Sequence, residues 1–237
     1  MTPYRLILLD VDGTLVHCGG AGRRSLERAL RQACGRPDGE LTELRLDGST
    51  DRLIVRQAMA MLGHAFTDGG CDRALAQYVE ILPSELADTS FRVLPGVVET
   101  LEALRRHGVP HGLCTGNVKE GARLKLRRGN LEDYFEWGPH AVGGFADDGE
   151  VRTRLVEAAL RRAAARFGTI EPRQVLVVGD TPLDVAAARD AGCATLAVAT
   201  GRYRVEELAA CGADHVAESL RSPAALGLLT GGAGPRP

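Results

Sequence analysis

The sequence predicts an α/β protein, a doubly wound parallel sheet with an α-helical segment inserted near its start. Three observations support this prediction. Short apolar runs at residues 6–9 and 175–178 end in turn residues, as expected for strands that are buried on both faces. Amphipathic segments alternate with such runs after residue 91, which favours right-handed β-α-β connections. Residues 16–90, by contrast, carry helical patterns and no strand signal.

The first expected strand, residues 6–9, runs directly into the acidic turn Asp10-Val11-Asp12-Gly13-Thr14-Leu15. A small-residue link at 17–22 follows and is expected to act as a hinge. In the insertion, apolar residues recur at helical spacing with charged residues between them. We therefore expect a core of residues 1–15 and 91–237 and a helical cap of residues 16–90. The three expected cap helices cover residues 24–34, a segment capped by Ser49 or Thr50, and residues 71–86.

The α/β alternation resumes after residue 91. The strong amphipathic pattern at residues 152–167 predicts a helix, and Pro182 is a favourable first residue for another. The glycine-rich residues 231–237 are expected to form a frayed tail. The further expected strands are 109–114, a weak one near 141–142, 175–178, 195–198 and 213–216, and the further expected helices are 95–107, 122–126, 205–210 and one from Ser219.

Composition is ordinary for a globular protein. The chain has 237 residues, of which 44% are hydrophobic and 25% charged, and its net charge of −2 gives no reason to expect nucleic acid or a membrane surface as a partner. No apolar stretch is long enough to span a bilayer. The six cysteines form no Cys-x-x-Cys pair, so a structural zinc site is not expected. Without an export signal, we expect a cytoplasmic protein with reduced thiols, either a monomer or a homodimer.

Polar residues follow three of the expected strands, at the point where each strand ends. Asp10 and Asp12 follow the first strand, Thr115-Gly116-Asn117 follows the second, and Asp180 with Asp184 follows the strand at 175–178. Because the carboxyl ends of parallel strands meet at one edge of a sheet, these groups should converge there. Carboxylates that converge repel one another unless a cation lies between them, and oxygen ligands favour Mg²⁺ over zinc. A turn with solvated acids is the alternative for the first pair.

Such a cluster has a definite chemistry. An aspartate can attack a phosphoryl group to give an aspartyl-phosphate, while Mg²⁺ neutralises the phosphate oxygens. A second acid two residues further on can protonate the leaving oxygen and later activate water. The Thr115 hydroxyl and the backbone N–H groups of Gly116 and Asn117 can hold phosphate oxygens at a helix N-terminus.

In order and spacing, these three segments resemble motifs one, two and four of the haloacid dehalogenase-like (HAD) hydrolase superfamily, and the insertion is similar to its type-one cap. The resemblance covers nearly the whole chain and suggests a phosphoglycolate phosphatase-like member with a Rossmann-like core. It implies that Asp10 is the nucleophile, Asp12 the general acid and base, and Thr115 a phosphate ligand. It also implies that Mg²⁺ is held by Asp10, Asp180 and the Asp12 backbone carbonyl, with Asp184 as a ligand through water or as a support.

The third motif of the family departs from its usual form in this sequence. The family usually places a lysine before the helix that leads into motif four, but Lys119 and Lys125 both lie too close to motif two. The matching region offers Arg152 or Arg154. We favour Arg152 because it opens the helix and its guanidinium can bind a phosphate and a carboxylate as a fixed fork. Lys125 is expected to lie at the protein surface.

The cap is expected to select the substrate. Thr50 and Asp51 open a cap helix after a glycine turn, and we predict that they contact the substrate, although an ordinary helix N-cap is the alternative. The expected partner is a small phosphorylated metabolite. Phosphoglycolate, a nucleoside monophosphate and a sugar phosphate all remain open.

The predicted function is therefore a Mg²⁺-dependent phosphatase that hydrolyses a small phosphomonoester through an aspartyl-phosphate. A phosphosugar mutase of the same superfamily remains an alternative, since the sequence does not report whether the aspartyl-phosphate is protected from water. Asp12 argues against a 2-haloacid dehalogenase, because those relatives lack this acid and need no metal. A non-catalytic phosphate-binding relative is the alternative from outside the enzymes.

Overall fold

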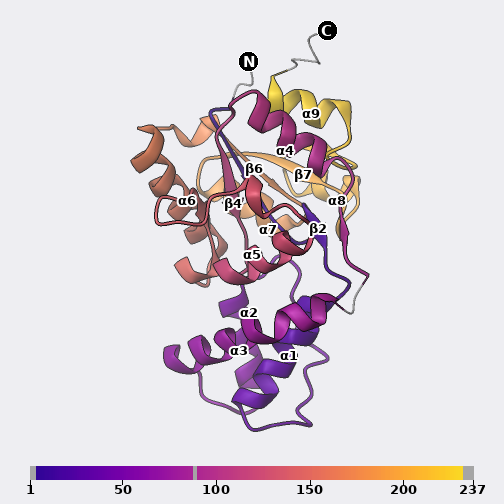
Figure 1. The fold of residues 1–237 in the computed structure, drawn as a ribbon, viewed down its shortest axis with the longest axis vertical. Coiled ribbons are helices and arrows are strands. Elements are labelled where there is room, and N and C mark those ends of the chain that lie inside the picture. The colour runs from indigo at the N-terminus through magenta and orange to yellow at the C-terminus, as the bar shows by residue number, and fades with distance from the viewer. Residues whose placement is uncertain (1–3, 88–89, 232–237) are drawn as a thin grey trace.

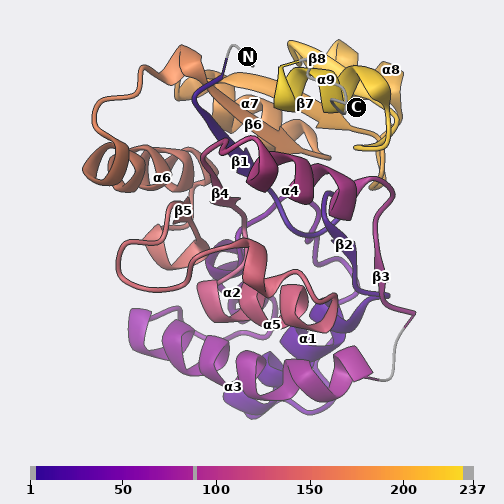
Figure 2. The ribbon, with the colours of Figure 1, turned by 45° about the horizontal axis from the view of Figure 1, so that its top comes forward.

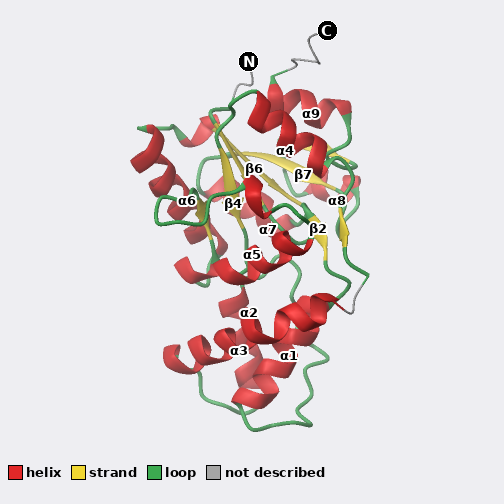
Figure 3. Cartoon of the chain, viewed as in Figure 1, coloured by secondary structure: helices red, strands yellow, loops and turns green. Residues whose placement is uncertain are grey.

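A computed structural model describes residues 4–87 and 90–231 of the chain. Its centre is a sheet of parallel strands, coloured yellow in Figure 3. The strand order is β5-β4-β1-β6-β7-β8, with β1 in the interior. This confirms the predicted doubly wound α/β fold. The strands are β1 (Leu6–Leu9), β4 (His111–Cys114), β5 (Gly143–Gly144), β6 (Val175–Gly179), β7 (Ala194–Val198) and β8 (His215–Ala217).

Helices cover both faces of the sheet because successive strand residues point to opposite sides. Ile7 and Leu9 of β1 pack into one apolar cluster, which includes residues of α4, α5 and α9, whereas Leu6 and Leu8 pack into a second cluster with α6 and α7. Both faces of β1 are therefore buried among apolar side chains. The core helices are α4 (Val97–Arg106), α5 (Lys119–Arg128), α6 (Arg152–Phe167), α7 (Pro182–Asp190), α8 (Val205–Ala210) and α9 (Pro223–Thr230), with short 3-10 turns at Glu132–Tyr134, Ala146–Asp148 and Pro172–Gln174.

The inserted segment forms a helical layer below the sheet in Figure 1. It contains α1 (Ala21–Ala33), α2 (Asp51–Met61) and α3 (Asp68–Ala87), and the turned view in Figure 2 shows α3 on the far side of α5 from the sheet. The domain limits of 1–15 and 91–237 for the core and 16–90 for the cap stay a prediction. Whether the two parts fold as independent domains stays a prediction.

Two short strands join the cap to the core. β2 (Val16–His17) pairs antiparallel with β3 (Arg92–Val93), so both polypeptide connections pass side by side through one ribbon. The expectation that no strand would occur between residues 16 and 90 was wrong at this point. The two residues of β2 are too few to show an alternating pattern, and only the partner strand, over seventy positions away, makes the pair.

Element boundaries otherwise shift by a few residues. The weak strand expected near 141–142 lies at Gly143–Gly144, and the strand expected from residue 109 begins at His111. Most of the tail expected at 231–237 lies outside the described residues. Within the described residues, no helix combines the length and the apolar character that crossing a bilayer would require.

The close packing of β5 against α6 predicts that a substitution in this strand destabilises the protein. Gly144 lies so close to α6 that an added Cβ would be 1.8 Å from the backbone oxygen of Leu155. We expect Gly144→Ala to lower the free energy of unfolding by about 2 kcal/mol or more, because neither backbone can move away cheaply. Gly138→Ala is the matched control, since a Cβ there meets no atom within 4 Å. Chemical denaturation of both variants measures the difference, and equal midpoints would contradict the close approach.

Candidate active site

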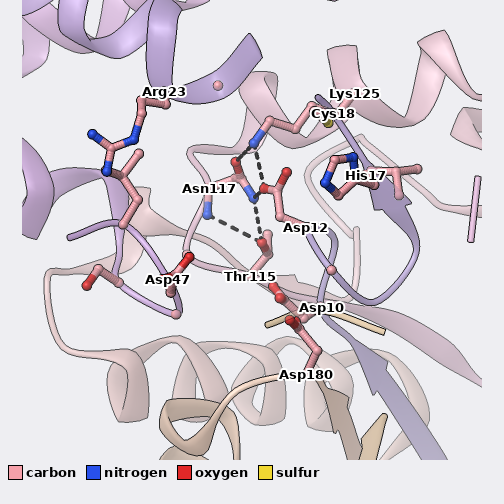
Figure 4. Close-up of a pocket in the computed structure, with 18 of the residues that line it drawn as sticks. Asp10, Asp12, His17, Cys18, Arg23, Asp47, Thr115, Asn117, Lys125 and Asp180 are labelled. Atoms are coloured by element: carbon pink, nitrogen blue, oxygen red, sulfur yellow. Dashed lines mark hydrogen bonds and ion pairs between the residues drawn. The ribbon is translucent and has the colours of Figure 1, made fainter. Parts of the chain in front are cut away.

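A pocket of about 510 Å³ lies between the carboxyl edge of the sheet and the cap. Its core wall is built from the residues that follow β1, β4 and β6, and its cap wall includes residues of α1, α2 and α3 (Figure 4). The three polar strand ends therefore meet at one edge, as the topology requires.

Three buried carboxylates lie together at the floor of this pocket. Asp10, Asp180 and Asp184 each offer an oxygen within 4.8 Å of the others. Thr181 holds Asp184 from the N-terminus of α7, because its backbone N–H and hydroxyl both donate to Asp184 Oδ2, at 3.0 and 2.7 Å. The Thr14 hydroxyl donates to Asp180 Oδ1 at 3.3 Å.

Two glycines allow Asp180 to lie against the backbone. A Cβ on Gly13 would lie 2.2 Å from Asp180 Oδ2, and a Cβ on Gly201 would lie 1.7 Å from the same atom. Gly13 also has a φ of +78°, a conformation that favours glycine. The Asp-Gly sequence after β1 is therefore required by the acid that follows β6, and not only by the local turn.

The electrostatics of the three acids indicate a missing positive charge. Burial raises the pKa of Asp10, and the neighbouring Asp184 and Asp12 raise it further against the opposing effect of Arg152. Burial also raises the pKa of Asp180, together with Asp184 and Asp10. Three carboxylates with one guanidinium cannot all ionise at low cost in this position. Their oxygen-only donor set fits a hard divalent cation.

Arg152 supplies the one positive charge that contacts this cluster among the described residues. Its Nη2 atom lies 3.0 Å from Asp10 Oδ1 and also pairs with Asp184 Oδ1, while Nη1 donates to the Gly48 backbone oxygen of the cap segment at 2.7 Å. Arg154, the other candidate, is largely exposed and pairs with Glu157. Because α6 begins at Arg152, the first-turn position aims this side chain into the site.

A second network connects Asp12 with the residues after β4. The Asn117 side-chain amide donates to Asp12 Oδ2 and to the Thr115 hydroxyl oxygen, each at 2.8 Å. Lys125 Nζ donates to Asp12 Oδ2 and to Asn117 Oδ1, each at 2.5 Å (Figure 4). Thr115 in turn acts on Asp10, whose pKa it lowers. Asn117 and Thr115 therefore connect the surroundings of the two acids that follow β1.

The expectation that Lys125 lies at the surface was wrong. Its side chain is 5% exposed and forms an ion pair with Asp12. Gly121 and Ala122 are buried on one face of α5, and Lys125 follows them at helical spacing, four and three residues further on. This periodicity was readable in the sequence, but it identified only the face of the helix and not the acid opposite it.

The ion pair determines the state of Asp12. The enclosed pocket raises the pKa of Asp12, but the Lys125 ammonium and the hydrogen bonds from Lys125 and Asn117 outweigh this effect and hold it below its ordinary value. In the structure, Asp12 is therefore an ionised carboxylate that points toward α5 rather than toward Asp180 (Figure 4).

The cap segment before α2 lies across the residues that follow β4. The Asp51 N–H donates to the Gly116 oxygen at 2.7 Å, and a Cβ on Gly116 would lie 2.3 Å from the Ser49 oxygen. Gly116 lines the pocket, and its N–H has no acceptor among the described residues. The buried backbone donor at this strand end is available for a ligand.

The structure gives the two predicted cap residues mainly structural contacts. The Thr50 hydroxyl accepts from Leu53 N as the N-cap of α2 and donates to the Glu150 oxygen at 2.7 Å, so both of its roles are taken, and it does not line the pocket. Asp51 does line the pocket, but its Oδ2 accepts from Val118 N at 2.8 Å. Burial raises the pKa of Asp51 to about 6 against the lowering effect of Lys125.

Comparison with known proteins agrees with this geometry. Residues 4–192 match the family model of the haloacid dehalogenase-like hydrolases. A phosphoglycolate phosphatase of Rhodospirillum rubrum is 32% identical over 92% of this chain and 88% of its own. Phosphoglycolate phosphatase 1 of Pseudomonas aeruginosa is 35% identical over 81% of this chain and 69% of its own.

Solved structures share the fold at lower identity. The crystal structure of a hydrolase from Pseudomonas syringae aligns with a TM-score of 0.65 at 23% identity, covering 93% of this chain and 95% of the other. CbbY from Rhodobacter sphaeroides, in complex with phosphate, aligns with a TM-score of 0.67 at 18% identity, covering 93% and 96%. Motif match, cap and buried acids together lead to one conclusion: the chain belongs to the haloacid dehalogenase-like hydrolases and is a phosphatase of that family.

Proposed function

We propose that this protein is a Mg²⁺-dependent phosphatase that hydrolyses a small phosphomonoester through an aspartyl-phosphate on Asp10. The observation that carries the proposal is the buried position of Asp10, between two further acids and the Arg152 guanidinium. The names of the relatives make 2-phosphoglycolate the first substrate to test. We also propose a cytoplasmic location; monomer and homodimer both remain compatible with the site.

Three groups are placed to bind the phosphate. The Arg152 guanidinium lies 3.0 Å from Asp10, so it can contact an oxygen of a phosphate that Asp10 attacks. The buried Thr115 hydroxyl acts on the Asp10 carboxyl, whose pKa it lowers. The Gly116 N–H adds a backbone donor at the same edge. Asn117 orients Thr115 and Asp12 through its side chain, whereas its own N–H is directed at the Thr115 hydroxyl.

The reaction then proceeds in two displacements. Asp10 forms a bond to phosphorus as the bond to the leaving oxygen breaks, and Asp12, which must first take a proton from water, gives that proton to the leaving oxygen. In the second displacement a water molecule attacks phosphorus, Asp12 accepts its proton, and the bond to Asp10 breaks. The ion pair with Lys125 favours the carboxylate form of Asp12, which is the form that the second displacement requires.

Asp10, Asp180 and the Asp12 backbone carbonyl would hold Mg²⁺. Both oxygens of Asp184 already accept hydrogen bonds, from Arg152 and Thr181, which favours a supporting position for this acid over direct ligation. When bound, the ion would neutralise negative charge on the phosphate and on the three acids.

The nucleophile and the metal requirement can be tested together. We expect Asp10→Asn to lower the kcat of p-nitrophenyl phosphate hydrolysis by about a thousandfold or more, since an amide is not a nucleophile here, and we expect EDTA to abolish wild-type turnover reversibly. Asp133→Asn, at an exposed acid in a turn, is the control. Full activity of the Asp10 variant would overturn the proposal, metal-independent turnover would favour dehalogenase-like chemistry, and conversion of a sugar phosphate without release of phosphate would favour a mutase.

Arg152 and Arg154 form a natural pair of variants because they lie on the same helical turn in different environments. We expect Arg152→Met to lower kcat/KM by about a hundredfold, since a charge beside the transferring phosphoryl group is lost. Arg154→Met removes only a surface pair with Glu157 and should stay within about twofold. Similar losses in both variants would place the phosphate elsewhere.

The buried acids also predict a pH-dependent stability. The fold raises the pKa of Asp10 to about 7 and that of Asp180 to about 9, so the folded state holds more protons than the unfolded chain. The metal-free protein should therefore lose stability as the pH rises from about 4, near the ordinary pKa of these acids, to about 9. Mg²⁺ should raise the melting temperature, and more strongly at the higher pH, because it binds the ionised acids. Thermal melts with and without Mg²⁺ measure this, and Asp180→Asn should abolish most of the shift.

A further inference from the structure

The Lys125 ammonium retains one hydrogen-bond donor that the protein does not use. An ammonium group carries three N–H donors. Two of them are taken by Asp12 Oδ2 and Asn117 Oδ1, and no further acceptor for Lys125 occurs among the described residues. Lys125 nevertheless lines the pocket. The remaining donor is therefore available to a ligand that enters between cap and core.

The cap leaves an opening beside this ammonium. Gly22 lies in the first turn of α1 and also lines the pocket, and a Cβ built on it would lie 3.4 Å from Lys125 Nζ. Its φ is not positive, so the backbone conformation does not demand glycine. Glycine inside a helix costs stability relative to alanine. The missing side chain is best explained by the space that it leaves next to Lys125.

A second donor borders the same space. Tyr78 of α3 is 1% exposed, yet it lines the pocket, and its hydroxyl has no hydrogen-bond partner among the described residues. The ring packs against Gly121, one helical turn before Lys125, where an added Cβ would lie 3.4 Å from the Tyr78 hydroxyl oxygen. A tyrosine hydroxyl at the wall of a pocket can donate a hydrogen bond to an oxygen of a bound ligand.

We propose that Lys125, Tyr78 and the opening at Gly22 form a subsite for the carboxylate of the substrate, so that the enzyme prefers short phosphorylated carboxylic acids over uncharged phosphate esters. The inference rests on the proposed phosphatase function and identifies what recognises the leaving group. An ammonium and a hydroxyl can both donate to one carboxylate. Arg23 lines the same pocket from α1 and adds positive charge to its cap wall (Figure 4).

The position of the subsite also limits the length of the substrate. Only the Asn117 side-chain amide separates the Thr115 hydroxyl from Lys125 Nζ, because it hydrogen-bonds both. A ligand that places its phosphate at Thr115 and Arg152 and its carboxylate at Lys125 is therefore short. A two-carbon acid such as 2-phosphoglycolate meets this requirement, whereas a nucleoside monophosphate has no carboxylate to place there.

The test compares two substrates of equal carbon length on variants that spare Lys125 itself. 2-Phosphoglycolate carries the carboxylate, and ethyl phosphate lacks it. We expect the wild type to prefer 2-phosphoglycolate, and Gly22→Ala to lower the ratio of the two kcat/KM values by about tenfold or more, the scale of one lost hydrogen bond to a charged group. Tyr78→Phe, which removes a single oxygen, should lower the same ratio several-fold, mainly through KM for 2-phosphoglycolate.

Gly227→Ala is the matched control, because it also adds a methyl group to a helix, in α9, where a Cβ meets no atom within 4 Å. The ratio should be unchanged in this variant. An equal ratio in wild type, Gly22→Ala and Tyr78→Phe would overturn the subsite while leaving the phosphatase proposal intact. If the wild type hydrolyses neither ester in the presence of Mg²⁺, the proposed function itself fails. Thermal melts of each variant separate misfolding from a lost contact.

Discussion

The burial of three carboxylates beside a single arginine is the constraint on which the rest of the site depends. Asp10, Asp180 and Asp184 come from two strand ends, and their mutual repulsion in a dry position would disfavour the fold without compensation. Arg152 supplies part of that compensation through Asp10 and Asp184. Thr181 and Thr14 satisfy further oxygens of Asp184 and Asp180. We expect the remaining negative charge to favour the binding of a cation at this position.

Arg152 also connects this cluster to the cap. The same guanidinium that contacts Asp10 donates to the Gly48 oxygen, and beside it the Arg56 side chain of α2 pairs with Glu150, at 2.7 Å between Nη2 and Oε1. Gly116 lets the cap backbone at Ser49 approach the loop that follows β4 without a side chain between them. The position of the cap and the geometry of the acids are therefore not independent, because they share the same donors.

Asn117 connects several side chains on the other side of Asp10, as Arg152 does beside the acids. Its amide contacts Asp12, Thr115 and Lys125, so that all of its hydrogen-bonding capacity but one acceptor position is used within the site. Because the Asn117 amide contacts all three side chains, we expect a substitution at any one of them to alter the hydrogen bonds of the other two. The two acids after β1 thus lie in different environments two residues apart: Asp10 has a raised pKa among acids, and Asp12 has a lowered pKa beside a lysine.

Local pattern was sufficient for the sheet, for the cap as a helical insertion and for the acids at the strand ends, because strand burial and parallel topology follow from periodicity and order along the chain. It also indicated Arg152, since the helix start is encoded locally. It also offered Thr50 as a helix cap, which the cap geometry in the fold agrees with. The environments of Lys125, Tyr78 and Gly22 were beyond it. Their roles depend on which groups face them from other elements: Lys125 from α5 meets Asp12 after β1, and Gly22 from α1 opens space at that same ammonium. Only the packing of the cap on the core brings these distant residues together, and no periodicity within one helix records what lies opposite it.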